Sequence, residues 1–193
     1  MSKKLNLSLS DYSTGGGSTG PVLATAAALV GANLVVVALA WDNPPTAGGI
    51  VTITFLMMIS FVAFIDVLHQ LMRAELLISR LKVEEIDEEL KEKIVLELNQ
   101  ISRWSRIMHV AGLIFTMIAF WIISYKYLVS IVGYHLIILF LPFILFVLIW
   151  VPKLTGIEKE VSVRSPENIV QLIVEIIFLV LICLDFFGII VIL

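Results

Sequence analysis

The stretch RAELLISRLKVEEIDEELKEKIVLELNQISRWSR, residues 73–106, is the one long charged segment in a sequence of 193 residues that otherwise consists largely of apolar runs. It carries seven of the 13 lysines and arginines. Lysine and arginine close to membrane crossings stay on the cytoplasmic side, so this segment predicts the side on which every other loop lies. We therefore expect residues 73–106 to be cytoplasmic.

The composition excludes a water-soluble core. The chain is 60% hydrophobic and 15% charged, with a mean hydropathy of +1.04, whereas soluble domains are about 45 to 50% apolar and about 25% charged. A formal net charge of -3, with basic residues spread along the chain, gives no reason to expect a nucleic-acid partner. The single cysteine, Cys183, cannot form an intrachain disulfide.

Apolar runs predict the fold class. A helix rises 1.5 Å per residue, so about 20 apolar residues cross a hydrocarbon core of about 30 Å. We expect an all-α integral membrane protein with five transmembrane helices, at residues 22–41, 50–72, 107–128, 131–151 and 169–193. They form a single membrane domain, residues 21–193, after a mobile cytoplasmic tail at residues 1–20.

Five spans with a cytoplasmic N-terminus place 12 basic residues inside and only Lys126 outside. This asymmetry is what the positive-inside rule requires. The turn WDNPPTAGG, residues 41–49, should be outside, because two prolines and two glycines stop the helix there. We expect a multi-pass protein of the cell membrane.

The cytoplasmic segment should form an amphipathic helical hairpin between helices two and three, with its turn near residues 81–83. Its first arm has about 9 residues and its second about 20, roughly 14 Å against 30 Å at the helical rise. The excess is expected to lie along the bilayer surface or against a partner. Apolar residues repeat at helical spacing on the second arm: Ile86, Leu90, Ile94, Leu98 and Ile101.

Two surfaces are candidates for association beyond the lipid bilayer itself. The first helix carries Ala24, Ala28 and Ala32 at four-residue spacing, which lets another helix approach closely. The second surface is the amphipathic arm, residues 86–101. Both indicate a homo-oligomer or other membrane subunits as partners.

Ionisable residues inside the spans are the candidate site residues, because a charge in hydrocarbon is costly. Counting from the interfaces places an inner polar layer within roughly 5 to 12 Å of the cytoplasmic boundary. Its members are Asp66, His69, His109 and Glu175. A second, outer layer contains His135 and Asp185, and Asn33 is expected to be alone at mid-depth.

Three interpretations compete for the inner layer. It could relay protons or cations, since histidine titrates near neutral pH. It could bind a metal through its two histidines and two carboxylates, although no HExxH or ExxH spacing is present. It could instead hold helices together by hydrogen bonds, with Asp66 paired to Arg73 and the histidines at the interface.

The sequence contains no Walker loop, no GxSxG and no Rossmann glycine fingerprint, so neither an enzymatic activity nor a cofactor or metal is expected. The leading hypothesis is a small proton or cation transporter or channel-forming protein that uses the inner layer. The alternative is a non-catalytic structural or assembly subunit of a larger membrane complex.

The expected topology can be tested by cysteine labelling in intact cells. Cysteines introduced at Ser2 and Lys91 should be shielded from a membrane-impermeant thiol reagent, while one at Thr46 should react, because the basic loops are retained inside. Labelling at Lys91 from outside would contradict the orientation.

Overall fold

A computed structural model describes residues 19–81, 88–154 and 166–193. These residues form five α-helices and no strand: α2 (Thr19–Asp42), α3 (Ile50–Leu81), α4 (Glu88–Val132), α5 (Leu136–Leu154) and α6 (Pro166–Phe186). Helices α2, α3, α4 and α6 are long and apolar enough to cross a membrane, and α5 adds a shorter apolar stretch, Leu136–Val151. The predicted all-helical membrane class is confirmed. Most of the predicted tail and the turn residues Lys82 and Val83 lie outside the described ranges.

Prolines and glycines mark two turns, of which the sequence predicts the first, at residues 41–49, while the second lies inside the predicted span at residues 131–151. Pro44 and Pro45 follow α2, and Gly48 and Gly49 then adopt φ of 81° and 94°, values that L side chains rarely tolerate. Gly133, with φ of 83°, separates α4 from α5. Its N–H donates to the carbonyl of Val129, which caps the end of α4.

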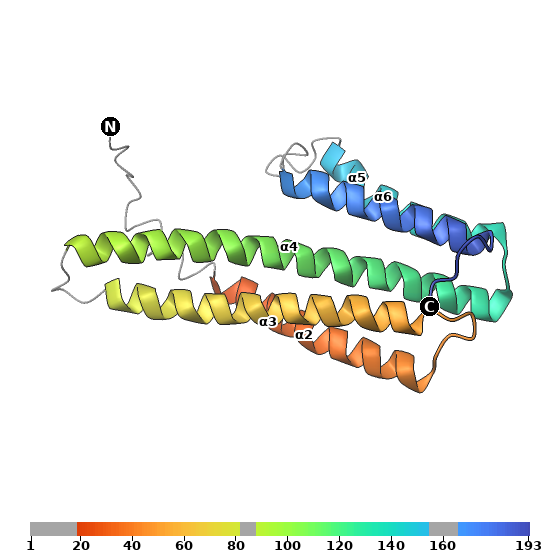
Figure 1. The fold of residues 1–193 in the computed structure, drawn as a ribbon, viewed down its shortest axis with the longest axis horizontal. Helices are drawn as coiled ribbons and strands as arrows, with labels where there is room; N and C mark the ends of the chain where they lie inside the picture. Colours follow the sequence, from red (N-terminus) through yellow and green to blue (C-terminus); the bar gives the residue numbers. More distant parts are fainter. Residues whose placement is uncertain (1–18, 82–87, 155–165) are drawn as a thin grey trace.

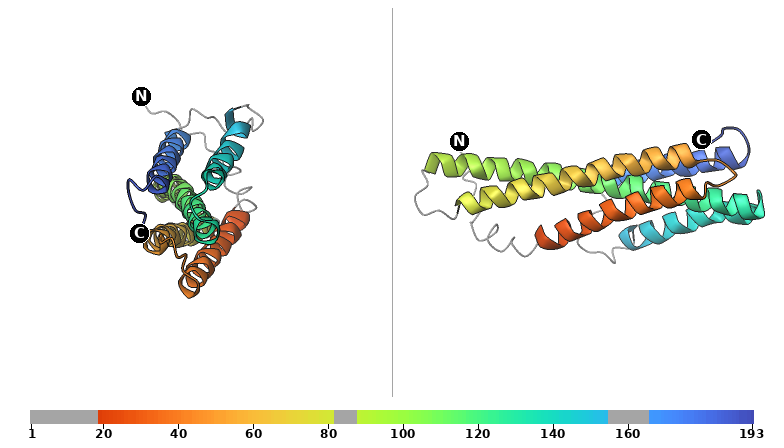
Figure 2. Two further views of the ribbon diagram at one scale, coloured as in Figure 1. Left: turned by 90° about the vertical axis from the view of Figure 1, so that its right-hand side faces the viewer. Right: turned by 90° about the horizontal axis from the view of Figure 1, so that it is seen from below.

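Helices α3 and α4 make the most extensive contact in the fold, and α4 also contacts α5 and α6. Figures 1 and 2 show α3 and α4 as a long antiparallel pair that projects beyond the ends of the other helices. In this projecting part, Ala74 and Leu77 of α3 form a buried cluster with Ile94, Leu98 and Ile101 of α4. Three of the five residues of the predicted apolar stripe therefore pack against α3 of the same chain.

The predicted excess length of the second arm is wrong. Arg73 bonds Glu97, and the indole of Trp104 donates to Asp66, so residues 97–104 of α4 run beside residues 66–73 of α3. Antiparallel neighbours joined by a short connection have arms of equal length. The predicted third span begins directly after Arg106, the last arginine of the charged segment. In the structure, α4 is one continuous helix from Glu88 and contains no separate surface helix.

Helix α2 packs on α3 through one side only. Ala26, Asn33 and Ala40, seven residues apart, are buried, while the predicted small-residue face of Ala24, Ala28 and Ala32 is exposed. Ala26 lies in a cluster with Phe64 and Val67 of α3. Phe64 also lies over Gly112 of α4, where an added Cβ would come within 2.9 Å of the ring. Close helix contact here needs glycine.

The last helix ends earlier than predicted. We expected a span at residues 169–193, but α6 ends at Phe186 and the chain turns at Gly188, where φ is 71°. The final residues return to the start of α3, where the N–H of Thr52 donates to the main-chain oxygen of Leu193 at 2.6 Å. Figure 1 shows this end of the chain beside α3. Residues 187–193 thus satisfy one of the unpaired N–H groups at the start of a helix.

The α3–α4 contact can be tested with Leu98→Asp and a matched control, Leu90→Asp. Leu98 is 3% exposed and Leu90 is 51% exposed, although both belong to the predicted stripe. A carboxylate buried without a partner costs several kcal/mol, so Leu98→Asp should strongly lower the free energy of unfolding while Leu90→Asp changes it little. Circular dichroism during denaturation in detergent measures the difference. Equal stability of the two variants would show that the arms are not packed together.

Candidate functional site

A buried ion pair joins α4 to α6. The Nζ of Lys126 lies 2.9 Å from both carboxylate oxygens of Asp185, and the two side chains are only 1% and 2% exposed. Lys126 lies near the end of α4, and Asp185 lies in the last turn of α6. The other three ion pairs among the described residues are all on α3 and α4, with more exposed side chains.

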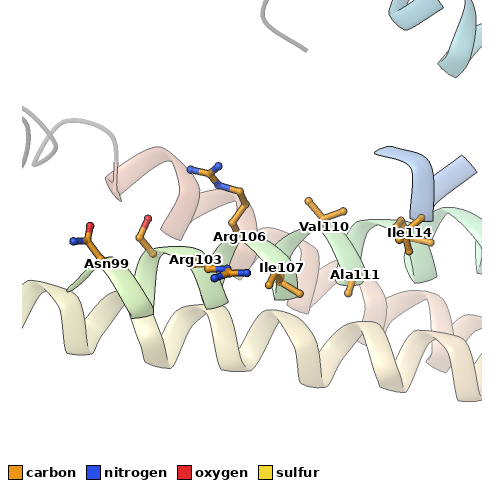
Figure 3. Close-up of a pocket in the computed structure, with 9 residues that line it drawn as sticks. Asn99, Arg103, Arg106, Ile107, Val110, Ala111 and Ile114 are labelled. Atoms are coloured by element: carbon orange, nitrogen blue, oxygen red, sulfur yellow. The ribbon is translucent and has the colours of Figure 1, made fainter. Parts of the chain in front are cut away.

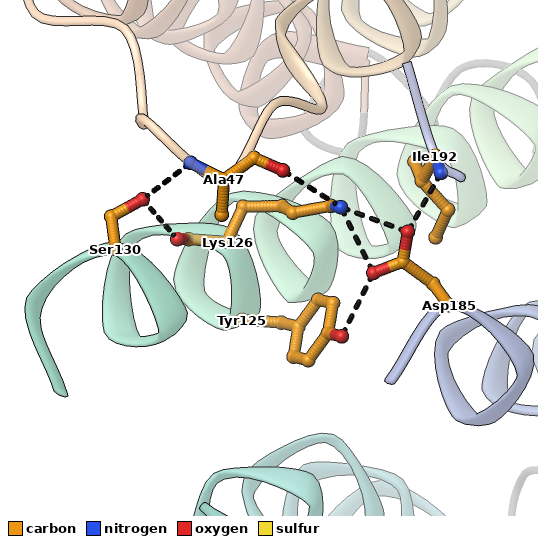
Figure 4. Close-up of polar contacts among 6 residues, drawn as sticks. All are labelled: Ala47, Tyr125, Lys126, Ser130, Asp185 and Ile192. Atoms are coloured by element: carbon orange, nitrogen blue, oxygen red, sulfur yellow. Dashed lines mark hydrogen bonds and ion pairs between the residues drawn. The ribbon is translucent and has the colours of Figure 1, made fainter. Parts of the chain in front are cut away.

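Every remaining hydrogen-bonding group of the pair is used by a neighbour (Figure 4). The Tyr125 hydroxyl donates to Oδ2 of Asp185 at 2.8 Å, and the backbone N–H of Ile192 donates to Oδ1 at 2.7 Å. Lys126 also donates to the carbonyl of Ala47 at 3.1 Å. The site therefore joins four segments: the α2–α3 connection, α4, α6 and the final residues.

The backbone around the pair is held as well. Ser130 donates to the Lys126 carbonyl at 2.8 Å and accepts from the N–H of Ala47 at 2.9 Å. Gly49 faces the lysine stem, where an added Cβ would come within 2.8 Å of Cγ. A buried pair whose charges and hydrogen bonds are all satisfied is stable in place, and removing one partner leaves a costly unpaired charge. This arrangement is typical of an ion pair that holds helices together.

Glu175 is a second buried carboxylate, with 0% of its surface exposed. Its Oε2 accepts from the Trp150 indole at 2.5 Å, and its Oε1 accepts from the Gln171 amide at 2.6 Å. Trp150 belongs to α5, so Glu175 lies at the contact between α5 and α6. No cation bonds it within the described part of the chain, in contrast to Asp185.

A third polar cluster joins α2, α3 and α4. Ser60 accepts from the Asn33 amide at 2.9 Å and donates to the Gly112 carbonyl at 2.8 Å. Thr116 lies 2.6 Å from the Ser60 hydroxyl and 3.4 Å from Oδ1 of Asn33. The expectation that Asn33 is alone at mid-depth is wrong, because a span's neighbours cannot be read from its own sequence.

The members of the predicted inner layer have different surroundings. Asp66 accepts from Trp104 at 2.8 Å, and His69 is exposed. His109 packs edge-on against Phe64 with ring centroids 5.8 Å apart, and its Nδ1 is buried without a hydrogen-bond partner. Glu175 lies with Trp150. Among the described residues, no hydrogen bond or ion pair joins any two of these four side chains.

The alternative pairing of Asp66 with Arg73 is also wrong, because Arg73 bonds Glu97 at 2.5 Å and Asp66 bonds the Trp104 indole. A metal site receives no support in residues 19–81, 88–154 and 166–193, which contain no group of three or more potential ligands.

The two residues of the predicted outer layer also have different surroundings. His135 is exposed in the turn between α4 and α5, where its backbone N–H donates to the Gly133 carbonyl at 3.0 Å, while Asp185 is buried with Lys126. We did not predict Lys126 as the partner of Asp185, because the positive-inside rule counts it only as the one basic residue on the outer side. The sequence does place a lysine and an aspartate at the same end of two spans, and this pattern could have predicted the pair.

No protein-family model matches the chain, and neither a curated protein nor a solved structure matches it. The chemistry of these polar groups therefore follows from their geometry alone.

The structural role of the ion pair predicts a specific pattern of stabilities. Lys126→Met should lower the free energy of unfolding by about 3 to 5 kcal/mol, because it leaves Asp185 buried and unpaired. Adding Asp185→Asn should restore much of that loss, since the second change removes the stranded charge. Lys93→Met, at the exposed pair with Glu89, should change stability little. Denaturation in detergent measures all three. A double variant no more stable than Lys126→Met would contradict the structural role of the ion pair.

Proposed function

We propose that this chain is a non-catalytic structural or assembly subunit of a larger membrane complex, embedded in the cell membrane through five spans. This proposal rests on one observation: groups of the same chain occupy the hydrogen-bonding positions of Lys126 and Asp185. A site that relays charge or binds substrate needs a group that exchanges partners, whereas this one connects four segments of one chain.

The arrangement of the helices supports the five-span topology. The apolar stretch of α5, Leu136–Val151, is roughly 24 Å long at the helical rise, a little less than the hydrocarbon core of about 30 Å. The proposed cytoplasmic end is the one to which α3 and α4 project, where Arg73, Arg80, Lys91 and Lys93 lie. The N-terminus belongs to the same side in this arrangement, and the hairpin formed by α3 and α4 is cytoplasmic at its tip.

The exposed side of α2 is the proposed partner surface. Ala24, Ala28 and Ala32 face away from α3, and an added Cβ at Gly31 would meet nothing within 4 Å. Small residues in a row favour close helix contact in membranes. The predicted surface at residues 86–101 is less suitable, because Ile94, Leu98 and Ile101 are already buried against α3.

Proton or cation transport is the second candidate, and Glu175 favours it. This carboxylate is buried in a candidate span and bonded by two neutral donors. Such a residue is a functional hypothesis by default in a membrane protein. Within the described structure, no hydrogen bond connects Glu175 to the other members of the predicted layer, Asp66, His69 and His109.

The subunit proposal predicts that the protein, purified in mild detergent, has a mass well above the 21.5 kDa of one chain. Ala28→Phe should reduce that mass by separating helices at the small-residue face, while Val180→Phe, on the exposed side of α6, should leave it unchanged. Light scattering after size exclusion measures the mass, and sequencing of copurified chains distinguishes other subunits from copies of this one.

The same preparation tests the second candidate. After reconstitution in vesicles, the purified chain should carry no proton or cation flux above that of empty vesicles. A flux that Glu175→Gln abolishes, in a variant that remains folded, would replace the subunit proposal with the transport one.

A further inference from the structure

One face of α4 changes from polar to apolar along its length and lines a groove. The groove has a volume of about 520 Å³, and α6 contributes to it through Val170. At its polar end are Arg103 and Arg106, and toward α6 are Ile107, Val110 and Ile114. These residues recur at three- and four-residue spacing, so they lie on one side of the helix (Figure 3).

The two arginines at the polar end have no counter-charge in the described structure. Arg73, Lys91 and Lys93 on the same two helices are each bonded to a glutamate. Arg103 and Arg106 are exposed, and no hydrogen bond or ion pair joins them to another of the described residues. Two guanidinium groups one turn apart, with several free N–H donors each, match the geometry of a phosphate.

The position of the groove along α4 indicates what occupies it. Trp104 is half exposed between the two arginines and donates its indole N–H to Asp66. An indole with one apolar side and one bonded polar tip is typical of the membrane interface. Ile114 lies eight residues beyond Arg106, about 12 Å further along the helix toward its apolar part. The order of polar, aromatic and apolar residues along the groove is the order expected between lipid headgroups and acyl chains.

We propose that this groove binds an anionic phospholipid of the bilayer. Its phosphate lies between Arg103 and Arg106, and one acyl chain runs along Ile107, Val110 and Ile114 as far as Val170. Basic pockets beside membrane helices select anionic headgroups in this way, and the volume is in the range of small-molecule sites. The proposal needs only that α4 enters the membrane, so it does not depend on whether the chain is a subunit or a transporter.

The test uses the full chain, purified and delipidated in mild detergent, with an equal mixture of phosphatidylglycerol and phosphatidylcholine. Native mass spectrometry counts the lipids that remain bound. The chain should retain phosphatidylglycerol in preference to phosphatidylcholine, and Arg103→Gln/Arg106→Gln should lower that preference roughly 25-fold, from about fivefold for each of the two lost basic contacts.

A matched control removes the same two charges elsewhere. Arg80→Gln/Lys93→Gln alters exposed residues that do not line the groove, so it should keep the preference for phosphatidylglycerol. Val110→Phe should instead reduce retention of both lipids by filling the apolar end. The proposal is wrong if the unaltered chain holds both lipids equally, if the control loses the preference as fully as the groove variant, or if inorganic phosphate alone displaces the lipid.

Discussion

The contact between Lys126 and Asp185 determines how the ends of the helices meet. A lysine and an aspartate taken out of water are stable together only when their geometry is good and their remaining hydrogen-bonding groups are satisfied. Here Tyr125, Ala47 and Ile192 satisfy them, from α4, the α2–α3 connection and the final residues. None of these segments can shift along its neighbour without exposing a charge to an apolar surrounding. The pair therefore sets the register of α6 against α4.

The other buried polar groups obey the same constraint at separate helix contacts. Asn33, Ser60 and Thr116 satisfy one another between α2, α3 and α4, and Glu175 is satisfied by Trp150 and Gln171 beside α5. In an apolar environment each group needs a partner within hydrogen-bond distance, so polar residues act as local markers of which helices touch. Four ionisable residues at similar depth do not by themselves form a layer, because depth says nothing about the direction in which a side chain points.

Much of the fold could be predicted from the sequence, since apolar run length and helix-stopping residues are local properties. The first two helices and the Pro44–Pro45 turn follow from them. The end of α6 could not, because the residues GIIVIL are as apolar in a returning segment as in a helix, and only Gly188 marks the turn. Nor could the partners of Asp66 and Asp185, which depend on the register between helices that are distant in sequence.

The two ends of the molecule use charge in different ways. At the projecting end of α3 and α4, exposed pairs such as Lys93 with Glu89 contribute little, and the buried contacts of Leu77, Ile94 and Leu98 hold the arms together. At the opposite end, the buried pair lies beside an apolar core in which Tyr125, Ile182 and Ile192 are buried together. The two kinds of pair differ in burial: the side chains of Lys93 and Glu89 are exposed, whereas those of Lys126 and Asp185 are buried, so the Asp185 carboxylate has only protein groups as partners. A charged end that does not need its charges for folding is free to use them on lipid headgroups, as Arg103 and Arg106 are placed to do.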